Sequence, residues 1–393
     1  MKENRAFILF SLILFIAIFT IENINQRFWL NDFKVYYSAA DALKNGTAVY
    51  GQSFGLSTGF YKYSPFILLC FLPASLFSFA FASSLHFFLI GIWTVLSLLM
   101  LKIIFDPNKL QNKRSNIIMV LALICIANHL VRELHLGNVN MLIVFLLCAC
   151  FYFDAKNKFA LSGVSLALAL LIKPYLLVLG LPFLLHKKHK TIWYCILSCL
   201  AAILVFTAFY GIGESLSLHK QWLKAMMEHN SYLESAHTIA AILNHCGIHL
   251  IQQSQQLMLL LFLLIIYSAT HLFLQSTNQT EQHPFSLHIS VFILLAILPN
   301  VLITDTEHFL FSLPLIFYNI TQLFKLKNKI LNGIFTIIGL GYGANSSDLL
   351  GNTLSNQFEK WGILGLANIA LIIFTIYILK FRKNKIPSSG AIL

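Results

Sequence analysis

The chain has 393 residues, of which 58% are hydrophobic and only 11% are charged, and its formal net charge is +12. A soluble globular protein carries about 25% charged residues, so this composition excludes an ordinary soluble domain. The basic residues lie at the ends of apolar runs, which is typical of membrane topology signals and not of nucleic-acid binding.

The apolar runs predict an all-α fold. They are long enough for membrane helices, which need about 17–25 residues for a full span. They also lack the period-2 alternation of a transmembrane β-barrel. We therefore expect a polytopic membrane helical bundle.

The first apolar run, residues 6–21, follows Lys2 and Arg5. It resembles a signal peptide, but no cleavage site of small residues comes after it. We predict an uncleaved first span that starts in the cytoplasm. Short basic clusters farther along the chain, together with the basic C-terminus, place both termini in the cytoplasm by the positive-inside rule.

Residues 22–82 are expected to form a first outer loop that contains short helices, one of them beginning at Phe33. Pro65 and Pro73 bracket the apolar stretch 65–76. This stretch is too short to cross a bilayer, so we place it as a short helix on the outer face.

The remaining runs bring the expected total to about twelve spans. Lys173 and Pro174 divide the run 159–185 into two short spans with a turn at the outer surface. A long external loop is expected over 211–235, and 237–251 is only weakly apolar. The other predicted spans are 83–104, 117–130, 141–153, 191–210, 256–275, 284–304, 309–324, 330–342 and 362–379. One membrane domain, 1–393, accounts for the chain, with a catalytic module over 1–210 and variable helices over 211–393.

Asp32 is the first candidate for chemistry, because it follows span one closely and has aromatic neighbours, Tyr36 among them. A partly desolvated carboxylate at the membrane edge suits a general base. An acid that caps the helix beginning at Phe33 is the alternative. Tyr36 is a candidate contact for a sugar or an acceptor.

Three cations lie at the outer ends of apolar segments: Lys62, Arg132 and Lys173. Cations gathered on one face suit a lipid-linked phosphate, because Arg grips phosphate with two parallel bonds and Lys acts as a point charge. Tyr63 is placed to hydrogen-bond the same oxygens. The alternative for each cation is a side chain that snorkels to the membrane surface.

Two further polar groups are expected on the outer side. Asn138 and Asn140, joined by His135, could bind sugar hydroxyls, or the amides could cap a helix. Glu307 and His308 lie between two predicted spans and could orient an acceptor, or form only a polar turn. No Asp-x-Asp motif occurs on the outer side, so we expect no dedicated Mg²⁺ or Mn²⁺ site and no other cofactor.

Several of these segments, in this order, resemble glycosyltransferase family 87, which comprises polyprenol-phosphate-mannose-dependent mannosyltransferases and relatives in the GT-C superfamily. The similarity rests on the order and spacing of short motifs and covers roughly the first 190 residues. Asn138 stands where the family's motif usually has Gln. The similar segments are DFKVYYSAADALKNGTAVY, FYKYSPFILLCFLP, LGNVN, LALALLIKPYLLVLGLPFLL and TDTEHFLFSLPL.

The resemblance implies an inverting transfer of a hexose such as mannose, or a pentose, from a polyprenyl-phosphate sugar to a glycan or glycolipid acceptor. The transfer would occur on the outer face of a bacterial inner membrane. Asp32 matches the family's catalytic carboxylate, and Lys62 and Lys173 match its lysines. A transporter or flippase of lipid-linked glycans is the alternative, but it would carry charges near the bilayer midplane. The expected partners are membrane lipid, donor and acceptor, without nucleic acid.

Overall fold

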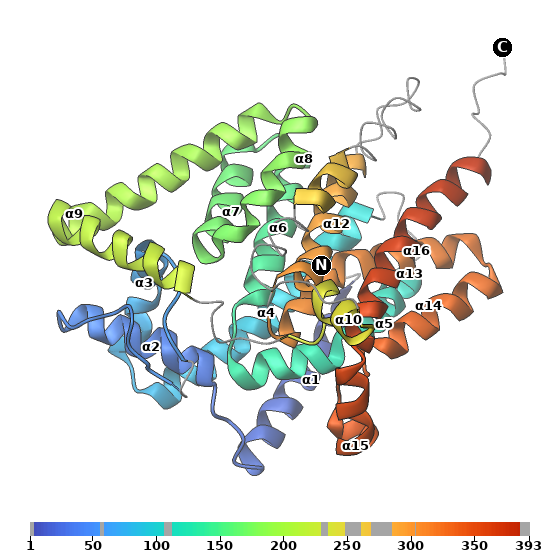
Figure 1. Cartoon of the computed structure of the whole chain (residues 1–393), viewed down its shortest axis with the longest axis horizontal. Helices are drawn as coiled ribbons and strands as arrows, with labels where there is room; N and C mark the ends of the chain where they lie inside the picture. Colours follow the sequence, from blue (N-terminus) through green and yellow to red (C-terminus); the bar gives the residue numbers. More distant parts are fainter. Residues whose placement is uncertain are drawn as a thin grey trace. The chain divides into compact units, whose positions relative to one another are not determined.

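The computed structural model describes residues 4–55, 59–105, 112–228, 235–247, 261–268, 285–302 and 304–385. These residues are helical almost throughout (Figure 1). Within them the one extended pairing is an isolated bridge between Ser53 and Phe60. The expected all-α class is confirmed.

Six of the described helices are long and apolar enough to cross a membrane. Six shorter apolar helices accompany them, and Pro65–Leu76 is one of these, as its length predicts. The chain is therefore a multi-pass membrane protein, while the total of about twelve crossings stays a prediction. The six long helices are Arg5–Ile24, Phe79–Phe105, Arg114–Leu136, His189–Met227, Thr306–Leu326 and Ile363–Phe381.

The chain forms two compact units. The first comprises Met1–Asn116 and His129–Leu233, and the second comprises Ile117–Asn128 and Glu234–Leu393. Helix α5 (Asn112–Leu136) contributes to both. The single membrane domain with modules 1–210 and 211–393 stays a prediction.

The first unit holds the helices up to α9. In its interior, α6 packs against α4 and α7, and α7 packs against α9. Gly163 permits the last contact, because a Cβ there would lie 2.7 Å from the backbone nitrogen of Cys195. Besides the ends of α5, the helices are α1 (Arg5–Ile24), α2 (Asn31–Lys44), α3 (Pro65–Phe71), η2 (Leu72–Leu76), α4 (Phe79–Phe105), α6 (Asn140–Ala155), α7 (Phe159–Ile172), η3 (Pro174–Leu179), α8 (Gly180–Leu185) and α9 (His189–Glu228).

Prolines set two helix boundaries near the outer loop. Pro65 occupies the first turn of α3, and the Ser64 hydroxyl caps that helix by accepting from the Ile67 backbone nitrogen at 3.4 Å. Pro174 ends α7 at Ile172, because the residue before a proline is pushed out of helical geometry. Lys173 accordingly has φ −132° and ψ 95°.

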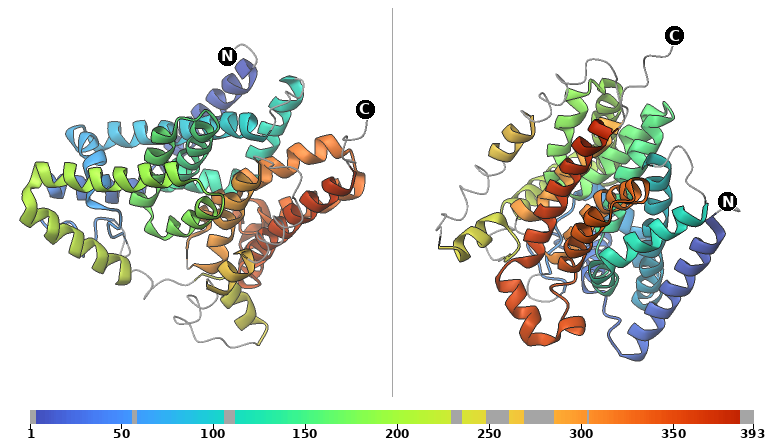
Figure 2. Two further views of the ribbon diagram at one scale, coloured as in Figure 1. Left: turned by 90° about the horizontal axis from the view of Figure 1, so that it is seen from above. Right: turned by 90° about the vertical axis from the view of Figure 1, so that its right-hand side faces the viewer.

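Two segments expected as loops are helical instead. Helix α5 runs to Leu136, so the span predicted to end at residue 130 continues through Arg132 and His135. Charged side chains do not stop a helix, and α5 ends where Gly137 turns to φ +72°. The predicted loop 211–235 begins with the second arm of α9, which bends at Gly211 (φ 80°) into a hairpin (Figures 1 and 2).

The second unit has a polar centre at Asn368. The Asn368 side-chain oxygen accepts from the hydroxyls of Ser312 and Tyr342, and its amide donates to Ala296 O and Asn300 Oδ1. Besides residues 117–128 of α5, the helices are α10 (Ile239–His245), α12 (Phe285–Val301), η5 (Thr306–Ser312), α13 (Leu313–Leu326), α14 (Lys329–Gly341), α15 (Ser347–Lys360) and α16 (Ile363–Lys385). Residues 261–268 are also helical, and the rest of the predicted span 256–275 lies outside the described residues.

Candidate functional site

Asp32 lies in the first turn of α2 and is half-buried. It is not the N-cap of that helix, because Leu30 holds that position with φ 38° and no side-chain cap. The Oδ2 atom of Asp32 accepts a hydrogen bond from Asn138 Nδ2 at 2.8 Å. The positive end of the helix dipole also favours a carboxylate here. Asp32 is thus tied to the turn between α5 and α6.

That turn approaches α2 through Gly137. A Cβ on Gly137 would lie 2.8 Å from Phe33 Cβ, and its φ of +72° is one that glycine adopts without strain. His86 of α4 fixes the turn from another side, because its Nε2 atom pairs with Gly137 O at 2.9 Å while its ring stacks on Phe33. The glycine of LGNVN therefore lets Asn138 reach Asp32.

Two buried tyrosines, Tyr36 and Tyr63, extend the hydrogen-bonded group around Asp32 and Asn138. The Tyr36 hydroxyl lies 2.8 Å from the Tyr63 hydroxyl and donates to Asn138 Oδ1 at 3.3 Å. Burial, followed by the nearby Tyr63 and Asp32, raises the pKa of Tyr36 well above its ordinary value. Burial likewise raises the pKa of Tyr63. Both phenols therefore keep their protons and take part in the group as neutral hydroxyls.

A second buried set joins α5, α6 and the end of α7. Glu133 is fully buried and accepts from Asn140 Nδ2 and from the Met141 backbone nitrogen, both at 2.9 Å. Lys173 donates from Nζ to Asn140 Oδ1 at 2.6 Å and is 7% exposed. The Lys173 ammonium is also 5.9 Å from the centre of the Tyr175 ring. The buried Lys173 is thus hydrogen-bonded to Asn140, which lies two residues after Asn138, the partner of Asp32.

Sequence reasoning missed Glu133. The predicted spans 117–130 and 141–153 left Glu133 in the connection between them, whereas α5 continues through Glu133. If the helix is extended past residue 130, Glu133 lies on the same face as the buried Leu130 and Leu134. A buried acid requires hydrogen-bonding partners, and this requirement is the signal that could have identified Glu133 from the sequence.

The other predicted residues of the first unit have different surroundings. Lys62 is half-buried, and its carbonyl oxygen accepts from Trp222 Nε1 of α9 at 3.0 Å. Arg132 is exposed and leaves α5 on a different side from Glu133, because consecutive helical residues are about 100° apart. His135 pairs through Nδ1 with Glu22 Oε2 at 2.9 Å, at the end of α1.

Glu307 and His308 belong to the second unit and lie on η5. They are buried rather than set in an open polar turn, with 0% and 8% exposure. The His308 Nδ1 atom lies 3.2 Å from Asp305 O, and its ring meets Phe311 edge-on. Their part in an acceptor site stays a prediction.

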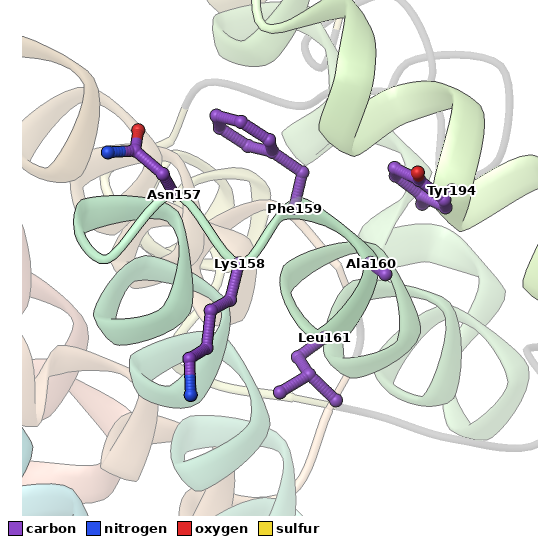
Figure 3. Close-up of a pocket in the computed structure, with 6 residues that line it drawn as sticks. All are labelled: Asn157, Lys158, Phe159, Ala160, Leu161 and Tyr194. Atoms are coloured by element: carbon purple, nitrogen blue, oxygen red, sulfur yellow. The ribbon is translucent and has the colours of Figure 1, made fainter.

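A surface hollow lies at the opposite end of α7 from Lys173 (Figure 3). Helix α7 has 14 residues, so the two ends are about 20 Å apart. None of the predicted site residues lines the hollow. Its lining residues are Asn157, Lys158, Phe159, Ala160, Leu161 and Tyr194. Within the described part of the chain, no three His, Cys, Asp or Glu side chains gather as a metal site requires.

A model of glycosyltransferase family 87 matches residues 60–299, which is more than half of the chain. The match includes Lys62, Tyr63, Arg132, His135, Asn138, Asn140 and Lys173. Asp32 and Tyr36 precede the matched range, and Glu307 and His308 follow it. No curated protein matches the chain.

Proposed function

We propose a lipid-linked sugar transfer for this chain, which belongs to glycosyltransferase family 87 and is therefore a membrane glycosyltransferase. The donor is a polyprenyl-phosphate sugar carrying mannose, another hexose or a pentose. The acceptor is a glycan or glycolipid hydroxyl. The helices form a GT-C type bundle in a bacterial inner membrane, with both termini in the cytoplasm and the site on the outer face.

The observation that supports this proposal most directly is the hydrogen bond from Asn138 to Asp32. It holds a half-buried carboxylate in one orientation beside the turn between α5 and α6. Preorganised groups of this kind lower the free-energy barrier, because the protein need not reorient them during reaction. The buried Lys173, which donates to Asn140 two residues after Asn138, adds a cation for the donor.

In the proposed reaction, Asp32 takes the proton of the acceptor hydroxyl as that oxygen attacks the anomeric carbon. The new bond joins the acceptor oxygen to the anomeric carbon. The bond between that carbon and the phosphate oxygen breaks, and its electron pair leaves with the polyprenyl phosphate. Attack opposite the leaving group inverts the anomeric configuration.

Cations stabilise the departing phosphate in this scheme. Lys173, Lys62 and Arg132 bind the phosphate oxygens, with Tyr63 as a hydrogen-bond donor. The phosphate carries its own charge and stays attached to the lipid, so the proposed reaction uses no nucleotide and no metal. The remaining candidates of the first unit bind sugar or acceptor hydroxyls: Tyr36, His135, Asn138 and Asn140.

The direct test is Asp32→Asn, with Asp41→Asn as the matched control on the same helix. Asp41 is part-exposed and pairs with Lys44 at 2.9 Å. Purified protein is assayed with decaprenyl-phosphate mannose and other decaprenyl-phosphate sugars, and lipid-linked glycans of a deletion strain are measured by mass spectrometry. Asp32→Asn is expected to lower the rate about 10²- to 10⁴-fold, the range for a general base.

Asp41→Asn is expected to keep the wild-type rate, because its ion pair is surface-exposed. Transfer that survives Asp32→Asn at the wild-type rate would remove Asp32 from the proposed role. If wild-type protein uses none of the decaprenyl-phosphate sugars, the proposed donor class is wrong.

A further inference from the structure

Glu133 of α5 forms hydrogen bonds with the first residues of α6. One carboxylate oxygen accepts from the Met141 backbone nitrogen and the other from Asn140 Nδ2, each at 2.9 Å. The N-cap of α6, Val139, has no side-chain cap of its own. A buried carboxylate at a helix N-terminus is stabilised by the dipole and by these charge-assisted bonds.

The same contact fixes which way the Asn140 amide points. An amide has one face that donates and one that accepts. Because Nδ2 is engaged by Glu133, Oδ1 points to Lys173, whose Nζ donates to it at 2.6 Å. A lysine has only donors to offer, so it requires the oxygen of Asn140 in this place.

We propose that Glu133 is a positioning residue that holds the Asn140 amide with its oxygen toward Lys173, and thereby sets the ammonium for the donor phosphate. The inference rests on the proposed function, which assigns Lys173 to that phosphate. Glu133 itself touches neither substrate. It acts through its hydrogen bond to Asn140.

Glu133→Gln tests this arrangement. The oxygen of Gln must face the Met141 N–H, because a backbone donor cannot rotate. The NH₂ of Gln then faces Asn140, whose amide must turn over to accept from it. The turned amide presents its NH₂ to Lys173, and two donors repel, so the ammonium is displaced.

Asn140→Asp supplies the compensating change. Alone, Asn140→Asp places two carboxylates in contact, and their repulsion disfavours the charged form of both. Combined with Glu133→Gln, it accepts from the Gln NH₂ on one oxygen and from Lys173 on the other. The double variant carries the same total charge as the wild type and restores the donor–acceptor pairs among Met141, residue 133, residue 140 and Lys173.

The measurement is the affinity of the purified full-length protein for decaprenyl phosphate, with decaprenol as the phosphate-free reference. Each single variant is expected to bind decaprenyl phosphate about 10- to 100-fold more weakly, the range for a lost hydrogen bond to a charged group. The double variant is expected to return to within about threefold of the wild type. If Glu133 merely capped α6, the double variant would not regain the affinity for decaprenyl phosphate.

Asp154→Asn is the matched control at the other end of α6. Asp154 is buried and pairs with Lys188 Nζ at 2.7 Å. Its replacement is expected to lower the unfolding temperature. The affinity for decaprenyl phosphate is expected to stay unchanged, because Asp154 lies about 20 Å along α6 from Asn140.

The outcomes separate the two proposals. Wild-type affinity in Glu133→Gln, or a double variant no better than the weaker single variant, overturns the inference and leaves the proposed function intact. An equal loss of affinity in Asp154→Asn also overturns it. A wild-type protein that binds decaprenyl phosphate no better than decaprenol overturns the proposed function and this inference with it.

Discussion

Asn138 donates from Nδ2 to Asp32 Oδ2 over 2.8 Å, and its Oδ1 atom accepts from both the Tyr36 hydroxyl and the Val139 backbone nitrogen. The two partners of its oxygen fix the orientation of the amide. Asp32 therefore meets an N–H group and not a competing oxygen.

Asn138→Asp is expected to lower the transfer rate about 100-fold or more, in the range that loss of a general base produces. Two carboxylates in contact share a proton, so Asp32 can no longer take the acceptor proton as the wild-type carboxylate does. Asn138→Gln keeps the amide and is the control, expected to retain transfer within about tenfold. Initial rates at saturating donor and acceptor measure the difference. A normal rate in Asn138→Asp would show that the contact with Asp32 has no part in catalysis.

Gly137→Ala is expected to destabilise the protein by about 1–3 kcal/mol, because the new Cβ meets Phe33 Cβ at 2.8 Å. It should also lower transfer by moving Asn138. Gly46→Ala is the matched control, since Gly46 has φ +67° but nothing within 4 Å of its Cβ position. The control suffers backbone strain alone, about 1 kcal/mol. Unfolding temperature and transfer rate are measured in detergent, and equal losses in both variants would contradict the steric explanation.

Asn368→Ala is expected to destabilise the second unit by about 2–4 kcal/mol. It removes the common partner of Ser312, Tyr342 and Asn300, which are buried. Buried groups left without a partner retain their full desolvation penalty. Thr336→Ala, which removes an exposed hydroxyl from α14, should change stability by less than about 0.5 kcal/mol. Chemical unfolding followed by Trp fluorescence distinguishes them, and equal stability of the two variants would refute the prediction.

The short motifs allowed much of the site to be chosen from the sequence. Asp32, Asn138, Asn140 and Lys173 were all selected from residue type, position at a segment end and family resemblance. The structure brings them into two hydrogen-bonded sets within the first unit. Their roles stay predictions, as do those of Lys62, Arg132 and His135.

The composition and the apolar runs were sufficient for the all-α class, the multi-pass membrane character and the short apolar helices near Pro65 and Pro174, because these depend on local hydropathy and proline geometry. The role of Glu133 and the helical extension of α5 were not available from the same pattern. A buried carboxylate is recognised by what surrounds it, and the Asn140 amide, the Met141 N–H and the dipole of α6 come together only when the helices pack.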